Sequence, residues 1–577
     1  MGDGTNNQNN PIEDIRLAFG LIEGEYRIER ENFFYVVKPA SENQKLEINV
    51  RIANVDIFNQ YHLIFKSCIF KDEIFFNNQT FLHRIEFEDC IFEAYAHFID
   101  TTFNEIVRFC GSTFRNGAIF LEATFEKTAN FSGATLRCMS FPYATFKKGA
   151  NFGATFKKWV DFSHATFEKK VDFSGAEFEE EAKQSGMILE KIEANFSNAT
   201  FKEEVNFSNV NFKVDIYFND AKFQKVDFSD ATFLQNADFQ NSHFNEQAFF
   251  SHATFQQVSF RGSIFDSNAY FFEAKFGTIP DFLQVNFNKN INFTNTELDF
   301  GFDEAKEKIE EIYKNREDEC KAEQNKKDKK YKEVPKRHKI SNEFRDSFRN
   351  IKSALIKDNN MLDASNYHRV ELYLKELELE YRNLGLRDFV DRIQLYCYRV
   401  TSDHHTDLLL ILNNVLGLIV LFGAFVCGLC CFASYDTKCI DYECCTSAEV
   451  YYLHSLMTNS FCVDCNVWSI FCLEAFLIMF VCCAFVVAFI LLVFFFSYVN
   501  SICRELGYWF IAFFVFVLFI LAVKPAIMLP IFGKLIDESL KIDFPAFTSL
   551  SVVYAILMFL LIWSLQKTAR KNTIIPN

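Results

Sequence analysis

The sequence lacks the short motifs by which many enzymes are recognised. Its 577 residues contain no G-x-x-x-x-G-K-[S/T] phosphate loop, no G-x-G-x-x-G dinucleotide turn, no H-E-x-x-H zinc motif and no G-x-S-x-G nucleophile elbow. The eleven histidines are scattered, and His404-His405 stand at the edge of a long apolar segment without a ligand pattern. We therefore expect no catalytic site and no cofactor, and we predict that the protein is not an enzyme.

Two further absences limit the function. Residues Met1 to Pro11 are polar and Asn-rich, without the basic start and apolar core of a secretory signal peptide. We expect residues 1–25 to be disordered. The net charge is −16, but acidic and basic residues are interleaved through the central part of the chain. Because no strongly basic face is expected, nucleic acid is not an expected partner.

Phenylalanine is present in large excess, with 73 residues, and from Phe65 to Phe276 it returns mostly every five or six positions. A small or β-branched apolar residue stands two positions before many of these Phe residues. The phrase A-T-F-E-K-K-V-D-F-S-G at 165–175 returns as A-T-F-K-E-E-V-N-F-S-N at 199–209. A short fixed period with an inward apolar pair and polar spacers predicts a solenoid.

The period also indicates how the solenoid is built. The unit is too short for two helix turns and does not fit a simple alternating strand. As one side of a square coil, each unit points its Phe and its small residue inward, and coils stack about 4.8 Å apart. Asp or Asn before Phe, as at Asp161 and Asp172, suits tight corner turns. The predicted core ladder contains Phe125, Phe131, Phe146, Phe162, Phe167, Phe173, Phe201, Phe207, Phe233 and Phe255.

These A-[D/N/T]-F-x-x units resemble the bacterial pentapeptide repeat family, with Phe in place of the more common central Leu. The resemblance implies a right-handed quadrilateral β-helix. Because five- and six-residue steps alternate here, we expect the extra residue to bulge out at alternate corners. The predicted β-helix covers residues 65–298 with an insertion at 179–195, and residues 26–64 are expected to form capping strands that cover its first coil.

Helical patterns follow the repeats. Residues 299–340 predict a charged helix and a basic linker. Residues 341–403 predict a helical hairpin and a juxtamembrane helix, because apolar residues recur every three or four positions. Ser341 is the expected N-cap of the hairpin's first helix, and Gly385 is expected to stop its second helix.

The last part of the chain, residues 404–577, predicts a four-helix transmembrane domain. Each of its apolar segments reaches the roughly 20 residues that span a bilayer. Basic residues gather before the first segment, between the second and third, and after the fourth. This distribution predicts that both termini and the β-helix are cytoplasmic. The expected spans are about 408–433, 468–499, 508–530 and 547–565.

Two groups of residues in this domain are candidate sites. The loop predicted to lie outside the cytoplasm carries the candidate disulfide cysteines Cys439, Cys444, Cys445, Cys462 and Cys465. A metal site is a less favoured alternative for the C-x-x-C pair. Glu474 and Lys524 are expected at similar depth in neighbouring spans, and we hypothesise that they form an intramembrane ion pair. A structural role for this pair is favoured over a conduction pathway.

A Phe-centred repeat followed by several spans resembles the membrane-bound pentapeptide repeat proteins of bacteria, a group without an assigned activity. The resemblance implies an inner-membrane protein with membrane lipid and an unidentified protein as partners. Our first hypothesis is a non-enzymatic scaffold that presents a cytoplasmic β-helix for protein binding. The alternatives are an oligomeric ion channel or membrane sensor gated by its cytoplasmic domain and, disfavoured by mixed charge and membrane attachment, a DNA mimic that modulates topoisomerases. Whether the chain forms a homo-oligomer stays open.

Overall fold

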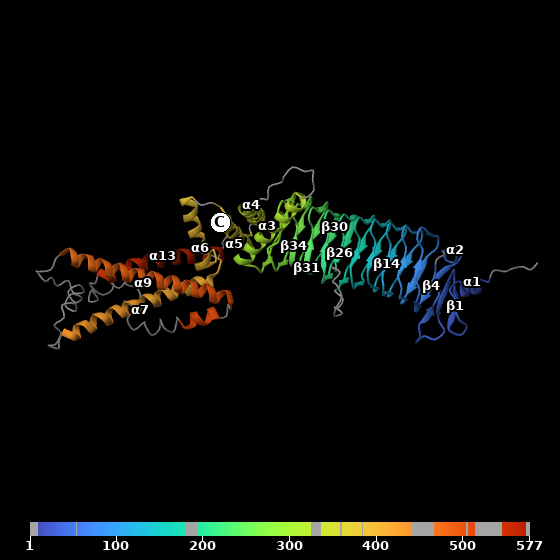
Figure 1. The fold of residues 1–577 in the computed structure, drawn as a ribbon, viewed down its shortest axis with the longest axis horizontal. Helices are drawn as coiled ribbons and strands as arrows, with labels where there is room; N and C mark the ends of the chain where they lie inside the picture. The colour runs from blue at the N-terminus through green and yellow to red at the C-terminus, as the bar shows by residue number, and fades with distance from the viewer. Residues whose placement is uncertain are drawn as a thin grey trace, which may run out of the picture. The chain divides into compact units, whose positions relative to one another are not determined.

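The computed structural model describes residues 10–52, 55–179, 193–324, 336–357, 360–382, 385–404, 406–440, 467–502, 506–513 and 545–572. The chain divides into two compact units, Met1–Tyr381 and Arg382–Asn577, and each is described by itself. The first unit is a β-solenoid with helices at both of its ends, and the second is a group of long helices (Figure 1).

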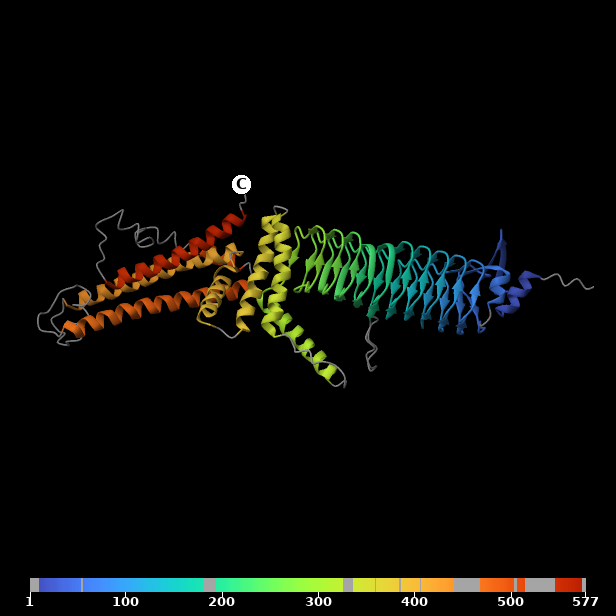
Figure 2. The same cartoon turned by 90° about the horizontal axis from the view of Figure 1, so that it is seen from above.

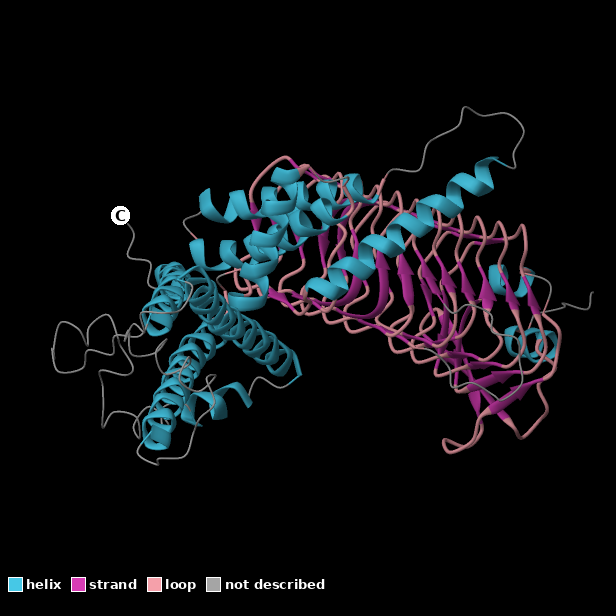
Figure 3. Ribbon diagram, turned by 60° about the vertical axis from the view of Figure 1, so that its left-hand side comes forward, coloured by secondary structure: helices cyan, strands magenta, loops and turns pink. Residues whose placement is uncertain are grey.

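The solenoid is a stack of about 11 turns of parallel strands, most of them only two residues long (Figure 3). Along one side, β5 (Cys68–Phe70) pairs with β9 (Ile91–Phe92), β9 with β13 (Thr113–Phe114), and the column continues to β40 (Glu297–Leu298). Thr102 pairs with Thr124 and Thr124 with Thr145, so one turn takes 22 residues and the next 21. The strands form one sheet of 21 and one of 19. The predicted solenoid is confirmed.

Phenylalanine rings fill the interior of the solenoid, each stacked on the ring one turn away. Phe233 stacks on Phe212 with centroids 4.8 Å apart and on Phe255 at 4.7 Å. Rings of adjacent columns meet edge to face instead, as Phe207 and Phe218 do at 5.5 Å. Both arrangements suit the aromatic quadrupole. All ten residues of the predicted core ladder are buried, none more than 2% exposed.

The corners within five-residue steps are tight turns. Ala123 N donates to Phe120 O at 3.1 Å, which closes a β-turn whose third residue, Glu122, has a left-handed φ of 57°. Glycine holds the equivalent place at Gly133 and Gly175, but most turns use Asn, Asp, His or Glu. The aspartates before Phe brace the corners, since Asp161 Oδ1 accepts from Ser163 N at 2.9 Å.

In two six-residue steps the extra residue is accommodated by a bulge within a strand. The strands β27 (Thr200–Asn206) and β31 (Thr232–Asp238) run through such a step without interruption. Their pairing with β30 (Lys222–Asp227) and β34 (Thr254–Ser259) shifts register just after Phe201 and Phe233. A local bulge of this kind admits one residue more on one strand than on its partner.

A hairpin and two short helices cover the first turn. The hairpin strands β1 (Tyr26–Glu31) and β2 (Phe34–Pro39) are antiparallel, and β2 pairs in parallel with β4 (His62–Lys66). The helix α2 (Asp56–Gln60) follows β3 (Leu46–Ile48) and buries Phe58. These elements stand where the sequence predicts capping strands.

The helix α1 (Pro11–Ala18) corrects the expected disorder of residues 1–25, which is wrong for residues 10–25. The side chain of Asn10 accepts from Ile12 N, and Pro11 is the first helical residue. Ile15 and Phe19 are buried, and the ring of Phe19 lies 4.9 Å from that of Phe65. The helix forms because its apolar side covers the open end of the phenylalanine core.

Three helices close the other end of the solenoid: α3 (Phe302–Gln324), α4 (Arg337–Lys357) and α5 (Met361–Glu380). The pair α4 and α5 stands across the last turn (Figure 2). Tyr367 is buried, with its ring 5.8 Å from Phe293 and its hydroxyl 2.7 Å from Thr296 Oγ1. Asp363 accepts from Asn295 N at 2.8 Å. One continuous apolar core therefore runs from Ile15 to Leu377.

Three predicted boundaries differ from the structure. The helix α4 begins at Arg337, so Ser341 is not an N-cap, and its hydroxyl donates to Arg337 O inside the helix. The helix α5 ends at Glu380, and Gly385 is the N-cap of α6 (Leu386–Ser402). The strand β26 (Glu193–Asn195) pairs with β22 (Val160–Asp161), so the solenoid resumes earlier than the predicted insertion 179–195 allows. Residues 180–192 lie outside the described residues.

The second unit contains α6, α7 (Leu408–Ile440), α9 (Val467–Ile502), α13 (Pro545–Asn572) and a helical stretch at 506–513. Three of these helices are long and apolar enough to cross a membrane, within Leu408–Phe425, Ile478–Asn500 and Ser549–Gln566. They coincide with the first, second and fourth predicted spans. The third predicted span, 508–530, lies largely outside the described residues.

The helices α9 and α13 both run antiparallel to α7. Phe496 of α9 packs near Leu410 at the start of α7, whereas Phe485 lies 6.2 Å from Phe422, farther along α7. The C-terminal end of α13 and the start of α7 lie at the same end of this group (Figure 2). Since both are antiparallel to α7, α9 and α13 run in the same direction.

The first prediction concerns the stacked core. Replacing Phe233 by Ala should lower the free energy of unfolding by about 3–5 kcal/mol, because two stacking partners lose contact and a cavity remains. Replacing Phe233 by Leu should cost clearly less, because Leu136 fills the same column in the natural chain. Urea unfolding of the chain in detergent, followed by circular dichroism, measures both changes. Equal losses for the two variants would contradict this account of the core.

The second prediction concerns the left-handed corners. Replacing Glu122 by Gly should raise the free energy of unfolding by about 0.5–1 kcal/mol, because glycine adopts a positive φ without a steric penalty. The matched control is Asn104→Gly, at a position without a positive φ. This control should lose about 0.5–1 kcal/mol through the added freedom of the unfolded chain. The same urea titration measures both changes. A lower free energy of unfolding in both variants would contradict the assignment of Glu122 to a left-handed corner.

Candidate functional site

The outward residues that precede the inward Phe residues form straight columns along the solenoid. Five successive members of one column are small and polar, and the next two members are aromatic. In order they are Asn130, Asn151, Asp172, Asn206, Asp227, Phe249 and Tyr270. The column becomes polar again at Asn292. Aromatic side chains therefore replace Asn or Asp on two adjacent turns.

The aromatic patch, as we call Phe249, Tyr270, His252 and Phe272, is built on two strands and the corners that follow them. Phe249 belongs to β33 (Ala248–Phe249) and Tyr270 to β36 (Ala269–Tyr270), and their rings stack 4.9 Å apart. On the corners that follow these strands, His252 and Phe272 meet edge to face at 5.5 Å. Phe249, Tyr270 and Phe272 are half-buried and His252 is exposed, so each ring keeps a part of its surface in contact with solvent.

Polar groups border the aromatic patch. Lys225 Nζ lies 5.8 Å from the centre of the Phe249 ring and 3.1 Å from a carboxylate oxygen of Glu204. On the other side, His252 Nδ1 lies 3.2 Å from the carboxylate of Glu273. Aromatic rings at the centre with charged groups at the rim form the arrangement found in protein–protein interfaces.

Outward aromatic pairs also occur elsewhere on the solenoid, but they are smaller. Phe75 stacks on His97 at 4.6 Å, with the guanidinium of Arg51 4.2 Å from the Phe75 ring. Tyr143 stacks on His164 at 4.6 Å. Tyr95 adds a third ring to the first group, 6.2 Å from His97, and the second group is a single stacked pair, so the four rings around Phe249 make the larger candidate.

The remaining solenoid surface carries mixed charge. Ion pairs join neighbouring turns, such as Lys147–Glu126 at 2.7 Å and Lys170–Glu204 at 2.7 Å. Exposed pairs of this kind contribute roughly 0–1 kcal/mol each and are weakened by salt. They keep the surface soluble and leave no extended region of one sign on these turns.

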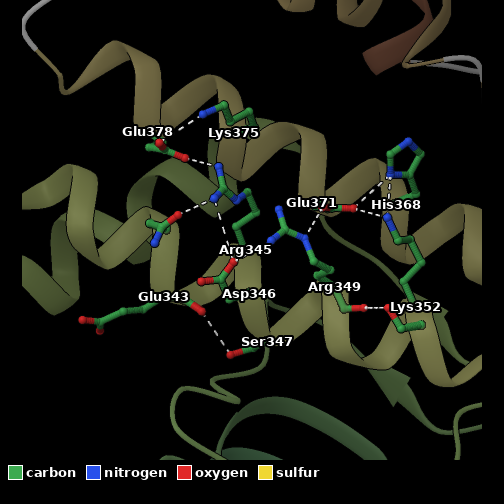
Figure 4. A network of polar contacts seen from close by, with 12 residues as sticks. Glu343, Arg345, Asp346, Ser347, Arg349, Lys352, His368, Glu371, Lys375 and Glu378 are labelled. Atoms are coloured by element: carbon green, nitrogen blue, oxygen red, sulfur yellow. Dashed lines mark hydrogen bonds and ion pairs between the residues drawn. The ribbon is translucent and has the colours of Figure 1, made fainter.

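A cluster of charged side chains joins α4 to α5 (Figure 4). The carboxylate of Glu371 accepts from Arg349 Nε at 3.0 Å and lies 3.1 Å from His368 Nδ1. It also accepts from Lys352 Nζ at 2.5 Å. Burial acts to raise the pKa of Glu371, but hydrogen bonds with His368, Lys352 and Arg349 outweigh it and hold the pKa at about 2. These hydrogen bonds and ion pairs hold α4 against α5, the two helices that we call the helical cap.

The aromatic patch is absent from the candidate residues that the sequence analysis proposed. The signal that could have found it is a departure from the repeat. An aromatic residue stands directly before the inward Phe in A-F-F at 248–250 and A-Y-F at 269–271, on two adjacent turns of a column that has Asn or Asp on the five turns before them, whereas Phe75 and Tyr217 precede an inward Phe in the other sheet. A search for aromatic residues at outward positions would have identified both turns.

The candidate residues in the predicted membrane domain are not brought together by the described structure. Glu474 belongs to α9 and Cys439 to α7, but their side chains lie outside the described residues, as do Lys524, Cys444, Cys445, Cys462 and Cys465. The ion pair and the disulfides therefore stay predictions. Within the described ranges, no group of three or more His, Cys, Asp or Glu residues could hold a metal ion.

One family model matches the chain. Pentapeptide repeats, in a model of nine copies, match residues 109–155, 218–264 and 228–275. All three stretches lie in the solenoid, so this is a pentapeptide-repeat solenoid, and the resemblance of the repeat units to pentapeptide repeats is confirmed. No curated protein and no solved structure matches the chain.

The third prediction concerns the pH dependence of the helical cap. Because the folded-state pKa of Glu371 is lowered from its ordinary value of 4.5 to about 2, its stabilising contribution is complete above pH 4.5. It is lost as the pH falls from 4.5 toward 2. Glu371→Gln should therefore lower the Tm at pH 7, and the difference from the natural chain should shrink toward pH 2.

Thermal melts of both chains from pH 7 to pH 2 measure this difference. The matched control is Glu311→Gln, because Glu311 pairs only with Lys308 one helix turn away at an exposed position. That change should shift the Tm little at any pH. A Tm difference for Glu371→Gln that is constant with pH would contradict the assignment.

Proposed function

We propose that this chain is a non-enzymatic scaffold of the cytoplasmic membrane, which holds a β-solenoid at the membrane and binds another protein through the aromatic patch. The single observation that carries the proposal is the replacement of Asn and Asp by Phe249 and Tyr270 on two adjacent turns. The inward residues of those turns keep the repeat, so the outward change does not serve the core.

The rigidity of the solenoid supports a binding role. Each turn is fixed by backbone hydrogen bonds to its neighbours and by stacked rings, and helices cover both open ends. A partner that binds such a surface loses little free energy to ordering of the scaffold. Stacked rings also lose less rotamer freedom than long polar side chains, which favours aromatic contacts at the centre of an interface.

The helices of the second unit support membrane attachment. Three apolar helices long enough to cross a bilayer stand in this unit, and the sequence between α9 and α13 supplies a fourth apolar segment. Basic residues precede α7 and follow the apolar part of α13. With four crossings, both termini lie on the same side, and the distribution of Lys and Arg favours the cytoplasm.

The fourth prediction tests the patch by crosslinking in cells. A photoreactive benzoylphenylalanine replaces Phe249 in the full chain, and the crosslinked protein is identified by mass spectrometry after membrane purification. The Kd between that purified protein and the natural chain is then compared with the Kd of Phe249→Asn/Tyr270→Asn. Because Asn fills this column on other turns, the solenoid should fold normally, and the Kd should rise at least about tenfold.

The matched control is Phe75→Asn, which removes an outward stacked ring on another turn and should leave the Kd unchanged. Circular dichroism checks that both variants fold. The proposal is overturned if no protein is crosslinked from position 249, or if the patch variant binds the captured protein as tightly as the natural chain.

A further inference from the structure

The helix α6 exposes most of its apolar side, and only Val400 near its C-terminal end is buried in the apolar core of the second unit. Phe389, Val390 and Ile393 are 50%, 55% and 47% exposed. On the opposite side, Asp388 and Leu395 are half-buried, and Ser402 is buried. A helix on the surface of a water-soluble domain has the reverse arrangement, with its apolar stripe against the core. The medium that covers the exposed side of α6 should therefore be apolar.

The position of α6 is fixed by its junction with α7. The helix ends at Asp403, whose φ is 45°, with Asp403 N donating to Arg399 O at 2.9 Å. Asp407 then accepts from Leu410 N at 3.0 Å and begins α7. Asn414 of α7 donates back to Thr401 O at 3.0 Å. As a result, α6 lies across the direction in which α7, α9 and α13 run (Figures 1 and 2).

The apolar side of α6 is continuous with the exposed apolar surface of α9. The ring of Tyr396 lies 6.2 Å from that of Phe494, which is itself exposed and belongs to the segment Ile478–Asn500 that is long enough to cross a membrane. At the same end of the unit, Tyr498 is 67% and Trp509 is 74% exposed. Tyr and Trp gather at the level of lipid headgroups.

Charged residues border the apolar side of α6. At 100° per residue, Arg387 falls on one edge of that side, and Arg392 and Arg399 fall on the other. Asp388 and Asp391 partly balance them, so the helix carries only a small positive charge. Guanidinium groups at the edges of an apolar stripe can reach lipid phosphates while the stripe lies among acyl chains.

We propose that α6 is an interfacial helix, which lies in the plane of the bilayer surface with Phe389, Val390 and Ile393 inserted between lipid chains. This inference rests on the proposed function, because it requires that α9 crosses a bilayer. Because α6 lies across the direction of the spanning helices, it lies in the plane of the bilayer. Because its apolar side is continuous with the exposed surface of α9, lipid covers that side. The partner of this face is a phospholipid leaflet.

The experiment places benzoylphenylalanine at one position at a time in the full chain, reconstituted in nanodiscs of phosphatidylcholine and phosphatidylglycerol. A fraction of the lipid carries an alkyne on its acyl chain, so crosslinked lipid is read by fluorescence. Positions 389 and 393 test the apolar side, and the exposed Gln394, which lies outside the apolar stripe of the same helix, is the matched control. Position 491, exposed on α9, reports on the spanning helix itself.

We expect lipid labelling at 389 and 393 to exceed that at 394 by at least about fivefold and to approach that at 491. Three results would overturn the proposal. In the first, positions 389 and 393 are labelled no more than 394 while 491 is labelled, which would mean that α9 is in the membrane and α6 is not. A crosslink from 389 or 393 to a second copy of the chain assigns this face to self-association. No labelling at 491 removes the spanning helix and the membrane scaffold as well.

Discussion

Contact between aromatic rings one turn apart is the interaction on which the solenoid depends. Burying one Phe side chain contributes roughly 1.5–3 kcal/mol, and a well-placed aromatic pair adds about 0.5–1.5 kcal/mol. Each turn contacts only the turns before and after it, so this gain is repeated along the stack. It also leaves a ring uncovered at each end, which explains why Phe19 covers Phe65 and Tyr367 covers Phe293.

The repeat separates what holds the structure from what the structure can bind. Inward strand positions hold apolar residues throughout, mostly Phe, Ala, Val and Ile, whereas the outward position before each Phe varies in chemical type. Along most of one column that position is Asn or Asp and serves the corner turn, as Asn206 does by accepting from Ser208 N at 2.9 Å. Phe249 and Tyr270 give up that bond for two half-buried rings. A change that costs a local hydrogen bond and adds no core contact is most simply explained by a partner.

The sequence alone was sufficient for the solenoid, because one local rule is repeated many times and the error at any one unit hardly matters. It was insufficient where a single element depends on what it packs against. The helix at Pro11–Ala18 has a clear N-terminal signal, but its apolar side becomes meaningful only beside the open core. Ser341 has the residue type of an N-cap, yet packing extends α4 back to Arg337. The amphipathic pattern of α6 indicates a helix and cannot say which medium covers it.

The same limit applies to the candidate sites. The core ladder follows from spacing, whereas the aromatic patch consists of outward residues that a search for the repeat passes over. The predicted pairing of Glu474 with Lys524 depends on how the spans pack against one another. The sequence of each helix taken alone does not contain that information. Such long-range contacts need the positions of neighbouring helices, and the periodicity of each helix supplies only its own apolar side.

The central claim is that the solenoid is held at a membrane by an even number of crossings, with both termini on one side. Tags at the two termini, probed with protease in sealed membrane vesicles of each orientation, test it most directly. The account predicts that both tags and the solenoid are cut together when the cytoplasmic face is outside and protected together when it is inside. Opposite accessibility of the two tags, or release of the chain by an alkaline wash, would contradict the claim.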